Sequence, residues 1–586
     1  MSPLLALLLG LALLATLPLL YPNQWARLSA PLRQAVKSRG IALTPQSVVG
    51  ALLFVGVALM LGMLIGIIGL GEFKSNMRFE RIPAYYWAYW NYADVRSWFW
   101  KGMAIAAGLI GTLTLIGLRK ENREVKNGPF TAAFMGAADR AHLLGSKEGL
   151  PLGRYKGRLM RYKPSPGKNW LEGHHGILAG TRGGKGVSAI IPAILDHDGP
   201  VVVPTDVKGE LFPVVMRHRQ SLGRRVIVLN PFRVVTDKVG ARFNPLDIVR
   251  PDHVERDASV IADGLIKKEN SGQPHFTDIA RCLVEAAVIV TVEREPADKR
   301  HLGTVRGMLL GVDNFGTFKA WAENADYFGE RVAHLAATFT QVGDKERGSF
   351  ISTMQRNLDF SAVKVMRDMM SGSDFNLADL LDDKLDIFVA MPQDQLDSQS
   401  NFMRLFVNAV KHIVTRESGR RHLKKNLLLV LDEFTRLGYM KELVDIATVS
   451  AGAGIQAMFI AQDIGLVEKI YAEEANSIFG QCATVRVSSL GRTDARTAEY
   501  VVKILGKKTV RTISRTKSHE LFERDRISHG ETPAPLMSND DVLELPNSKQ
   551  ILLPRGKPAL ILDKIVYYED AAYKDKADPN PTLRSG

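Results

Sequence analysis

A glycine-rich loop that carries one lysine is the part of this sequence whose residue types point to the most specific chemistry. An apolar run ends at Ala179, and an apolar helical pattern begins at Val187. This order of strand, loop and helix is typical of a P-loop, in which backbone N–H groups and a lysine bind phosphates. The residues expected to bind the nucleotide are Gly180, Thr181, Arg182, Gly183, Gly184, Lys185, Gly186 and Val187.

The loop departs from the usual P-loop pattern at two positions. Ala179 replaces the first glycine, and Gly186 replaces the Ser or Thr that usually follows the lysine. The remaining glycines let the backbone turn toward an anion, and the N-terminus of the following helix attracts negative charge. Taken alone, the loop is compatible with a phosphate site and with an ordinary tight turn.

Two acidic residues at the end of a second apolar run favour the phosphate site. Residues 427–431 show no polar alternation, which is typical of a strand buried on both faces of a parallel sheet. We expect Asp432 to hold Mg²⁺, directly or through water, and Glu433 to polarise the attacking water. Two solvated acids at a strand end are the alternative, but the lysine loop upstream favours a site for ATP and Mg²⁺.

The elements that must position these residues follow an α/β pattern. Predicted helices separate the predicted strands, which indicates a parallel, doubly wound sheet. The strands are expected at 174–179, 200–205, 225–229, 386–391, 427–431, 456–461 and 483–488.

One long segment of helical patterns interrupts this sheet. Residues 253–355 contain no convincing strand, so we expect an inserted all-α domain there. The nucleotide-binding domain then has two parts, 121–252 and 356–565, and its residues 123–168 are expected to be a polar lead-in to the first strand. Residues 566–586 are polar and are expected to form a disordered tail.

The first 120 residues predict a membrane anchor. Uncharged apolar runs indicate three transmembrane spans in a lipid bilayer, at about 3–21, 48–70 and 102–118. The first could instead be a signal peptide, but residues 1–20 lack the basic n-region. The loop 22–42 carries four basic and no acidic residues, which places it in the cytoplasm. The loop 72–101 is then periplasmic and the part after residue 120 cytoplasmic.

The composition indicates which kinds of binding partner are compatible with the chain and excludes sites that require several cysteines. The chain has 586 residues and a formal net charge of +14, which favours a surface that meets DNA or acidic lipid. Cys282 and Cys482 are its two cysteines, so disulfide scaffolds and zinc clusters are excluded.

Four ordered blocks resemble the type IV secretion coupling proteins, the TraG-type conjugative transfer ATPases. Gln462 and the block LELP at 543–546 also fit, and the resemblance covers about 125–570. In this family glycine commonly follows the lysine, so Gly186 is not a departure from the family pattern. It does remove the hydroxyl that often binds Mg²⁺, which leaves open how the metal is held. The blocks are TRGGKGV at 181–187, DVKGE at 206–210, FNPLD at 243–247 and LDEFTRLG at 431–438.

The resemblance implies a RecA-like P-loop ATPase that assembles as a homo-hexamer on the bacterial inner membrane. It would bind DNA without sequence preference and pass a relaxase–DNA complex, or effector proteins, to the inner-membrane components of a type IV secretion channel. The inserted domain would recognise the cargo, and Gln462 would join Glu433 in catalysis by sensing the γ-phosphate. The arginine that reaches a neighbouring subunit stays open among Arg436, Arg492 and Arg496.

Two other functions compete with this interpretation. A membrane-anchored chromosome-segregation DNA translocase usually carries a C-terminal winged-helix module, and too little sequence follows residue 565 for one. A nucleotide-binding scaffold without turnover is disfavoured because Glu433 retains the position of a base beside Asp432. The sequence leaves open whether the cargo is plasmid DNA, effector protein or both, and whether the ring forms without cargo.

Overall fold

The computed structural model divides the chain into two compact units, Met1–Asn127 and Gly128–Gly586. The residues that it describes are 60, 62–70, 81–106, 130–144, 149–162, 173–236, 240–267, 274–416, 421–516 and 526–582.

The described part of the first unit is a small helical cluster. Helix α5 (Ile82–Tyr89) buries Ile82 and Tyr86, which pack with Ile67 and Val95. Within the described residues, no helix combines the length and hydropathy that a bilayer crossing requires. The predicted span 3–21 lies outside the described residues, as do 48–59 of the second span and 107–118 of the third.

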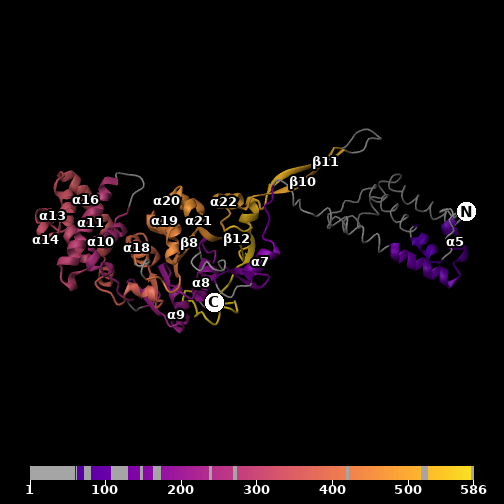
Figure 1. Ribbon diagram of the computed structural model, residues 1–586, viewed down its shortest axis with the longest axis horizontal. Coiled ribbons are helices and arrows are strands. Elements are labelled where there is room, and N and C mark those ends of the chain that lie inside the picture. The colour runs from indigo at the N-terminus through magenta and orange to yellow at the C-terminus, as the bar shows by residue number, and fades with distance from the viewer. Residues whose placement is uncertain are drawn as a thin grey trace. The chain divides into compact units, whose positions relative to one another are not determined.

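The second unit is built on an eleven-stranded mixed sheet with the order β2-β1-β13-β12-β9-β3-β8-β7-β4-β6-β5 (Figure 1). Its strands from β9 to β5 run parallel and lie within one residue of the seven predicted strands, so that prediction is confirmed. Their bounds are β3 (His174–Ala179), β4 (Val201–Asp206), β5 (Arg225–Leu229), β6 (Leu385–Ala390), β7 (Leu427–Leu431), β8 (Ile455–Ala461) and β9 (Cys482–Ser488).

Four antiparallel strands extend the sheet beyond β9, so the expectation of a purely parallel sheet is wrong. They are β1 (Leu150–Tyr155), β2 (Arg158–Tyr162), β12 (Lys549–Pro554) and β13 (Leu560–Asp563). β1 and β2 occupy the segment expected to be a polar lead-in. Pro151 and Gly153 flank a register shift in β1, and residues of these types weaken the sequence signal of a strand. Leu152 and Met160 are nevertheless fully buried against β12 and β13.

Helices cover both faces of the parallel part, which explains its continuous apolar runs. In β7, Leu428 and Val430 face a core shared with α8 (Ile191–Asp196) and α9 (Leu211–Ser221). Leu427, Leu429 and Leu431 face the opposite core. That core includes residues of α18 (Ser400–Arg416), α19 (Lys441–Thr448), α20 (Ile464–Tyr471), α21 (Glu474–Gly480) and α22 (Ala495–Leu505).

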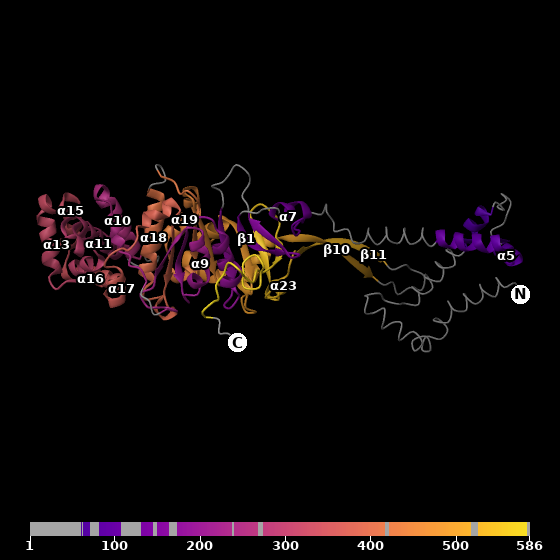
Figure 2. The same cartoon turned by 90° about the horizontal axis from the view of Figure 1, so that it is seen from below.

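The chain between β5 and β6 forms a group of helices at one end of the unit (Figure 2). This group occupies the segment in which the inserted all-α domain is predicted. Its apolar core is continuous with the one that covers the sheet. The helices are α10 (Val254–Leu265), α11 (Pro274–Arg294), α12 (Leu302–Leu310), α13 (Asn314–Glu323), α14 (Ala325–Phe328), α15 (Glu330–Thr340), α16 (Asp344–Leu358) and α17 (Lys364–Met369).

Three further elements complete the second unit. A separate two-stranded hairpin, β10 (Lys507–Thr516) with β11 (Arg526–Pro535), projects from the sheet (Figures 1 and 2). The short helix α23 (Asn539–Leu543) follows the hairpin in the chain, and the short helix α7 (Ala137–Leu144) precedes β1.

The C-terminal segment 566–582 packs against the unit, so the expectation of a disordered tail is wrong for these residues. Tyr567 and Tyr573 are buried in the core shared by α8 and α9. Asp570 pairs with Arg154, and the hydroxyl of Tyr573 donates to Asp196. Each of these partners lies more than 370 positions away in sequence, so local composition could not reveal them.

Candidate nucleotide-binding site

The strand order brings the two predicted motifs to one edge of the sheet. β3 pairs with β8, and β8 pairs with β7, all in parallel. The loop after β3 and the two acids after β7 therefore leave the sheet at the same carboxyl edge, with the end of β8 between them. Gln462 directly follows β8, and Asp206 ends β4 on the far side of β7. Ligands bind at such edges in open α/β sheets.

The glycine-rich loop folds back on itself and against the end of β9. The N–H of Gly183 donates to Gly180 O at 3.1 Å. Arg182 and Gly184 have φ of 60° and 74°, in the left-handed region. A Cβ on Gly180 would lie 2.5 Å from the carbonyl oxygen of Ser489, so this position has no room for a side chain. Thr181 and Arg182 are exposed at the loop tip.

The helix after the loop opens with a π-turn. It covers Gly186–Ile190 and continues into α8, with Val187 half-buried against the core. π-turns inside helices are frequent at functional sites. The N–H and the hydroxyl of Ser188 both donate to Gly184 O at 2.8 Å. The Ser188 hydroxyl is therefore bonded back into the helix and does not take the place of the one missing at Gly186.

Lys185, Glu433 and Gln462 meet at one carboxylate. Nζ of Lys185 lies 3.5 Å from Glu433 Oε1, and Gln462 donates from Nε2 to the same oxygen at 2.9 Å. Glu433 adopts a left-handed conformation, with φ of 51°. Arg436 approaches its other oxygen at 3.7 Å, so this arginine is engaged within its own chain.

Asp432 presents a buried carboxylate oxygen, Oδ1, that has no hydrogen-bond partner among the described residues. Burial raises the pKa of this carboxyl to about 6, with Glu433 and Glu210 adding to the shift and Lys185 opposing it. The buried Nζ of Lys185 also lacks a hydrogen bond within the described part of the chain. A buried acceptor without a donor fits a cation, and a buried ammonium fits phosphate oxygens.

The described residues contain no group of three or more His, Cys, Asp or Glu arranged to hold a metal. A Mg²⁺ ion bound with a nucleotide commonly takes one or two protein carboxylates and completes its shell with water and phosphates. Asp432 is therefore suited to the metal-binding role that the sequence predicts.

Asp206 organises the neighbouring strand end. Its carboxylate accepts the backbone N–H groups of Glu210 at 3.1 Å, Leu211 at 3.1 Å and Phe212 at 3.3 Å, at the start of α9. Burial raises its pKa to about 7, against these hydrogen bonds, which lower it. Lys208 Nζ lies 3.9 Å from Glu210 Oε1. Asp206 thus fixes the backbone that carries Glu210.

Lys564 is a residue of this edge that the sequence did not single out. It follows β13, and its Nζ donates to Gly183 O at 2.9 Å and to Ser489 Oγ at 2.7 Å. Burial lowers its pKa to about 8. No local motif marks this lysine, because its partner in the loop lies 381 positions earlier.

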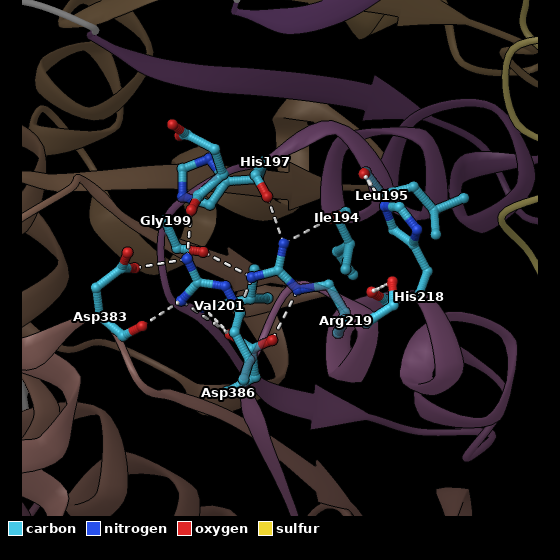
Figure 3. Close-up of polar contacts among 12 residues, drawn as sticks. Ile194, Leu195, His197, Gly199, Val201, His218, Arg219, Asp383 and Asp386 are labelled. Atoms are coloured by element: carbon cyan, nitrogen blue, oxygen red, sulfur yellow. Dashed lines mark hydrogen bonds and ion pairs between the residues drawn. The ribbon is translucent and has the colours of Figure 1, made fainter.

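A buried ion pair holds the opposite end of the P-loop helix (Figure 3). Arg219 of α9 is fully buried and donates to both carboxylate oxygens of Asp386, at 2.7 and 3.0 Å. It also donates to carbonyl groups of Ile194, His197 and Gly199. The end of α8 and the starts of β4 and β6 are thereby joined, which fixes the helix that carries Lys185.

A cleft of about 440 Å³ opens beside Glu433. It lies on the Gln462 side of the edge, and its polar lining includes Lys267, Asp397 and Arg436. Its size falls within the range of small-molecule sites. The cleft gives Glu433 a solvent-accessible side, from which a water molecule can reach it.

The chain is similar in sequence to known proteins. Residues 128–584 match the family described as type IV secretory system conjugative DNA transfer. Protein VirD4 of Rhizobium rhizogenes is 28% identical over 411 residues, which cover 69% of this chain and 59% of that protein. Conjugal transfer protein TraG of Escherichia coli is 26% identical over 440 residues, 68% of each. The chain spans about three fifths of the length of the VirD4 relatives.

The fold is also that of a solved structure. The bacterial conjugative coupling protein TrwBdeltaN70 superposes with a TM-score of 0.57 and 15% identity, over 75% of this chain and 95% of that one. Other TrwB structures hold a non-hydrolysable ATP analogue, or ADP and Mg²⁺.

Proposed function

Because the chain belongs to the type IV secretory system conjugative DNA transfer family, we propose that it is the ATPase that couples substrates to a type IV secretion channel. Its cargo would be relaxase-bound DNA, effector protein or both. The observation that carries the ATPase assignment is the meeting of Lys185, Glu433 and Gln462, next to Asp432, whose buried Oδ1 has no hydrogen-bond partner among the described residues. The TrwB complexes with ATP analogues, and with ADP and Mg²⁺, support the same cofactors here.

Each residue of the site has a distinct task in hydrolysis. Backbone N–H groups of the loop 180–187 other than that of Gly183, together with the ammonium of Lys185, bind the phosphates. Asp432 holds Mg²⁺, which when bound neutralises charge on the phosphate oxygens. Glu433 accepts the proton of the attacking water. Gln462 orients Glu433 through their hydrogen bond and responds to the γ-phosphate.

Phosphate binding would change the contacts of Glu433. In this structure Lys185 and Gln462 share its Oε1 atom. A γ-phosphate attracts the ammonium of Lys185 more strongly than one carboxylate does, because it carries more negative charge. Glu433 would then keep Gln462 as its partner and be available to water.

The assembly and location of the protein are parts of the same proposal. We infer a homo-hexamer at the bacterial inner membrane, anchored by spans at 3–21, 48–70 and 102–118, with the ATPase unit in the cytoplasm. The uncharged runs and the basic loop 22–42 support the anchor. The net charge of +14 supports DNA binding without sequence preference. Contacts with inner-membrane components of the channel follow from the family.

The family match disfavours a chromosome-segregation translocase, and the contacts of Glu433 disfavour a scaffold without turnover. The deciding experiment measures ATP hydrolysis by the full chain in lipid nanodiscs, with and without single-stranded DNA. We expect hydrolysis that DNA stimulates and that Lys185→Ala removes. A parent protein that binds ATP without hydrolysing it would contradict the proposal and favour the scaffold.

A further inference from the structure

The P-loop of this chain lacks a ligand that other P-loops provide. The Ser or Thr that usually follows the lysine places its hydroxyl on Mg²⁺. Gly186 stands at this position, and Ser188 uses its hydroxyl within the helix. In a Mg²⁺–nucleotide complex, the coordination position that this hydroxyl usually takes is therefore open to water or to another protein group beside Asp432.

The carboxylate of Glu210 lies at the place where that hydroxyl would project. A Cβ built on Gly186 would lie 3.5 Å from Glu210 Oε1, which is an ordinary contact distance. Glu210 comes from the turn between β4 and α9, in the block DVKGE. Oxygen of a carboxylate is a better Mg²⁺ ligand than oxygen of a neutral hydroxyl, because the cation is hard and doubly charged.

The two ends of the Glu210 carboxylate have different surroundings. Oε2 accepts hydrogen bonds from Asn580 Nδ2 at 3.1 Å and from Thr582 Oγ1 at 2.9 Å. Oε1 faces Gly186, and its nearest cation is the exposed ammonium of Lys208, at 3.9 Å. The C-terminal segment thus holds one oxygen and leaves the other directed at the P-loop.

Glu210 and Asp432 both lie beyond the carboxyl ends of neighbouring strands. Their strands, β4 and β7, are parallel neighbours, and Thr205 Oγ1 donates to Asp432 O at 2.8 Å. The charge of Glu210 acts on the carboxyl of Asp432. Two negative carboxylates beside a phosphate loop repel each other, and a divalent cation bound between them would offset this repulsion.

We propose that Glu210 replaces the missing hydroxyl and binds the Mg²⁺ of the nucleotide complex together with Asp432, directly or through one water. Asn580 and Thr582 act as positioning residues, because they orient the carboxylate without reaching the P-loop themselves. The inference rests on the proposed function, since it concerns the metal of the same ATP site. It also connects the C-terminal segment to the metal site.

The test measures the affinity for a fluorescent ATP analogue in a magnesium titration and in EDTA. Mg²⁺ should change the affinity for the analogue, and the Mg²⁺ concentration that gives half of this change should rise about 10-fold or more in Glu210→Gln. In EDTA the variant should bind the analogue as tightly as the parent or more tightly, because a negative charge near the phosphates is gone. A merely structural role for Glu210 would instead weaken binding under both conditions.

Rescue makes the assignment specific. Gly186→Ser restores the usual hydroxyl, and the space at residue 186 admits its Cβ. In the Glu210→Gln background this change should return the Mg²⁺ response toward that of the parent. Replacing the two positioning residues together, Asn580→Leu with Thr582→Val, should weaken the response less than Glu210→Gln does. Glu323→Gln, at an exposed ion pair on α13, is the matched control.

The outcomes separate this inference from the function on which it rests. If nucleotide binding by the parent depends on Mg²⁺ and Glu210→Gln shows the same dependence, the role of Glu210 is overturned. The ATPase proposal would remain intact. A failed rescue by Gly186→Ser, after a loss in Glu210→Gln, also overturns it. A parent that binds no nucleotide under either condition overturns the proposed function and this inference together.

Discussion

Gln462 donates a hydrogen bond of 2.9 Å to Glu433 Oε1 across the ends of two neighbouring strands. The contact joins a residue that can sense the γ-phosphate to one that can accept a proton from water. Because Lys185 lies 3.5 Å from the same oxygen, the phosphate-binding loop and the base are also connected.

Lys185→Ala should abolish ATP hydrolysis and substrate transfer without unfolding the protein. The ammonium makes one ion pair in the described structure, with Glu433, so the apolar core does not depend on it. Steady-state hydrolysis and the thermal unfolding profile should be measured together, with Lys319→Ala on α13 as the control. Turnover equal to that of the parent would remove the P-loop assignment.

Glu433→Gln should bind ATP and hydrolyse it about 10²–10⁴-fold more slowly than the parent. The amide retains the size of the side chain but cannot accept the proton of the attacking water. Nucleotide affinity and single-turnover hydrolysis distinguish the two steps. A variant within twofold of the parental rate would move the catalytic role to another residue.

The effects of Gln462→Ala and Glu433→Gln on turnover should not add. If Gln462 acts by orienting Glu433, its removal costs little once the base is already lost. A double-mutant cycle on the single-turnover rate measures this coupling. Additive losses would show that Gln462 acts on the nucleotide independently of Glu433.

Arg219→Met should lower the stability of the second unit by about 3–5 kcal/mol, because it removes the bidentate partner of the buried Asp386 and leaves it Arg224, at 4.0 Å, as its cation. Arg217→Ala, two positions earlier on α9, is the control. Its ion pair with Asp578 is largely exposed, so it should cost about 1 kcal/mol or less. Urea unfolding of the full chain gives both values. If both changes lower the free energy of unfolding equally, the buried pair does not hold α8 in place.

The parts that could be predicted from sequence are those with a strong local signal. Six of the seven parallel strands are buried on both faces, and β7 shows this as an unbroken apolar run, Leu427–Leu431. The seventh, β5, lies at the edge of the sheet and is partly exposed. The loop around Lys185 and the acids after β7 carry motifs, and the order of strands brings them together. β1 lacks such a signal, because Pro151 and Gly153 interrupt it.

The rest depends on contacts between distant segments. The polar composition of residues 566–582 is typical of a disordered segment. Their order depends on contacts with Arg154 and Asp196, which are distant in sequence. Glu210 can be placed at a strand end from the sequence. Its approach to Gly186, however, depends on how the P-loop helix packs and on Asn580, which lies 370 positions away.

The full chain should bind DNA with little sequence preference and lose affinity steeply as salt rises. The formal net charge of +14 supplies cations for phosphate contacts, and such contacts carry no sequence information. Each phosphate neutralised by the protein adds about 0.9 to the slope of log affinity against log salt on duplex DNA, and about 0.7 on single strands. Fluorescence anisotropy with labelled oligonucleotides of two unrelated sequences, across a salt series, measures both properties. We expect equal affinities for the two sequences and a linear fall with salt. A flat salt response, or no binding at low salt, would indicate that the excess of basic residues serves acidic lipid or protein cargo instead, because neither requires release of counterions from DNA.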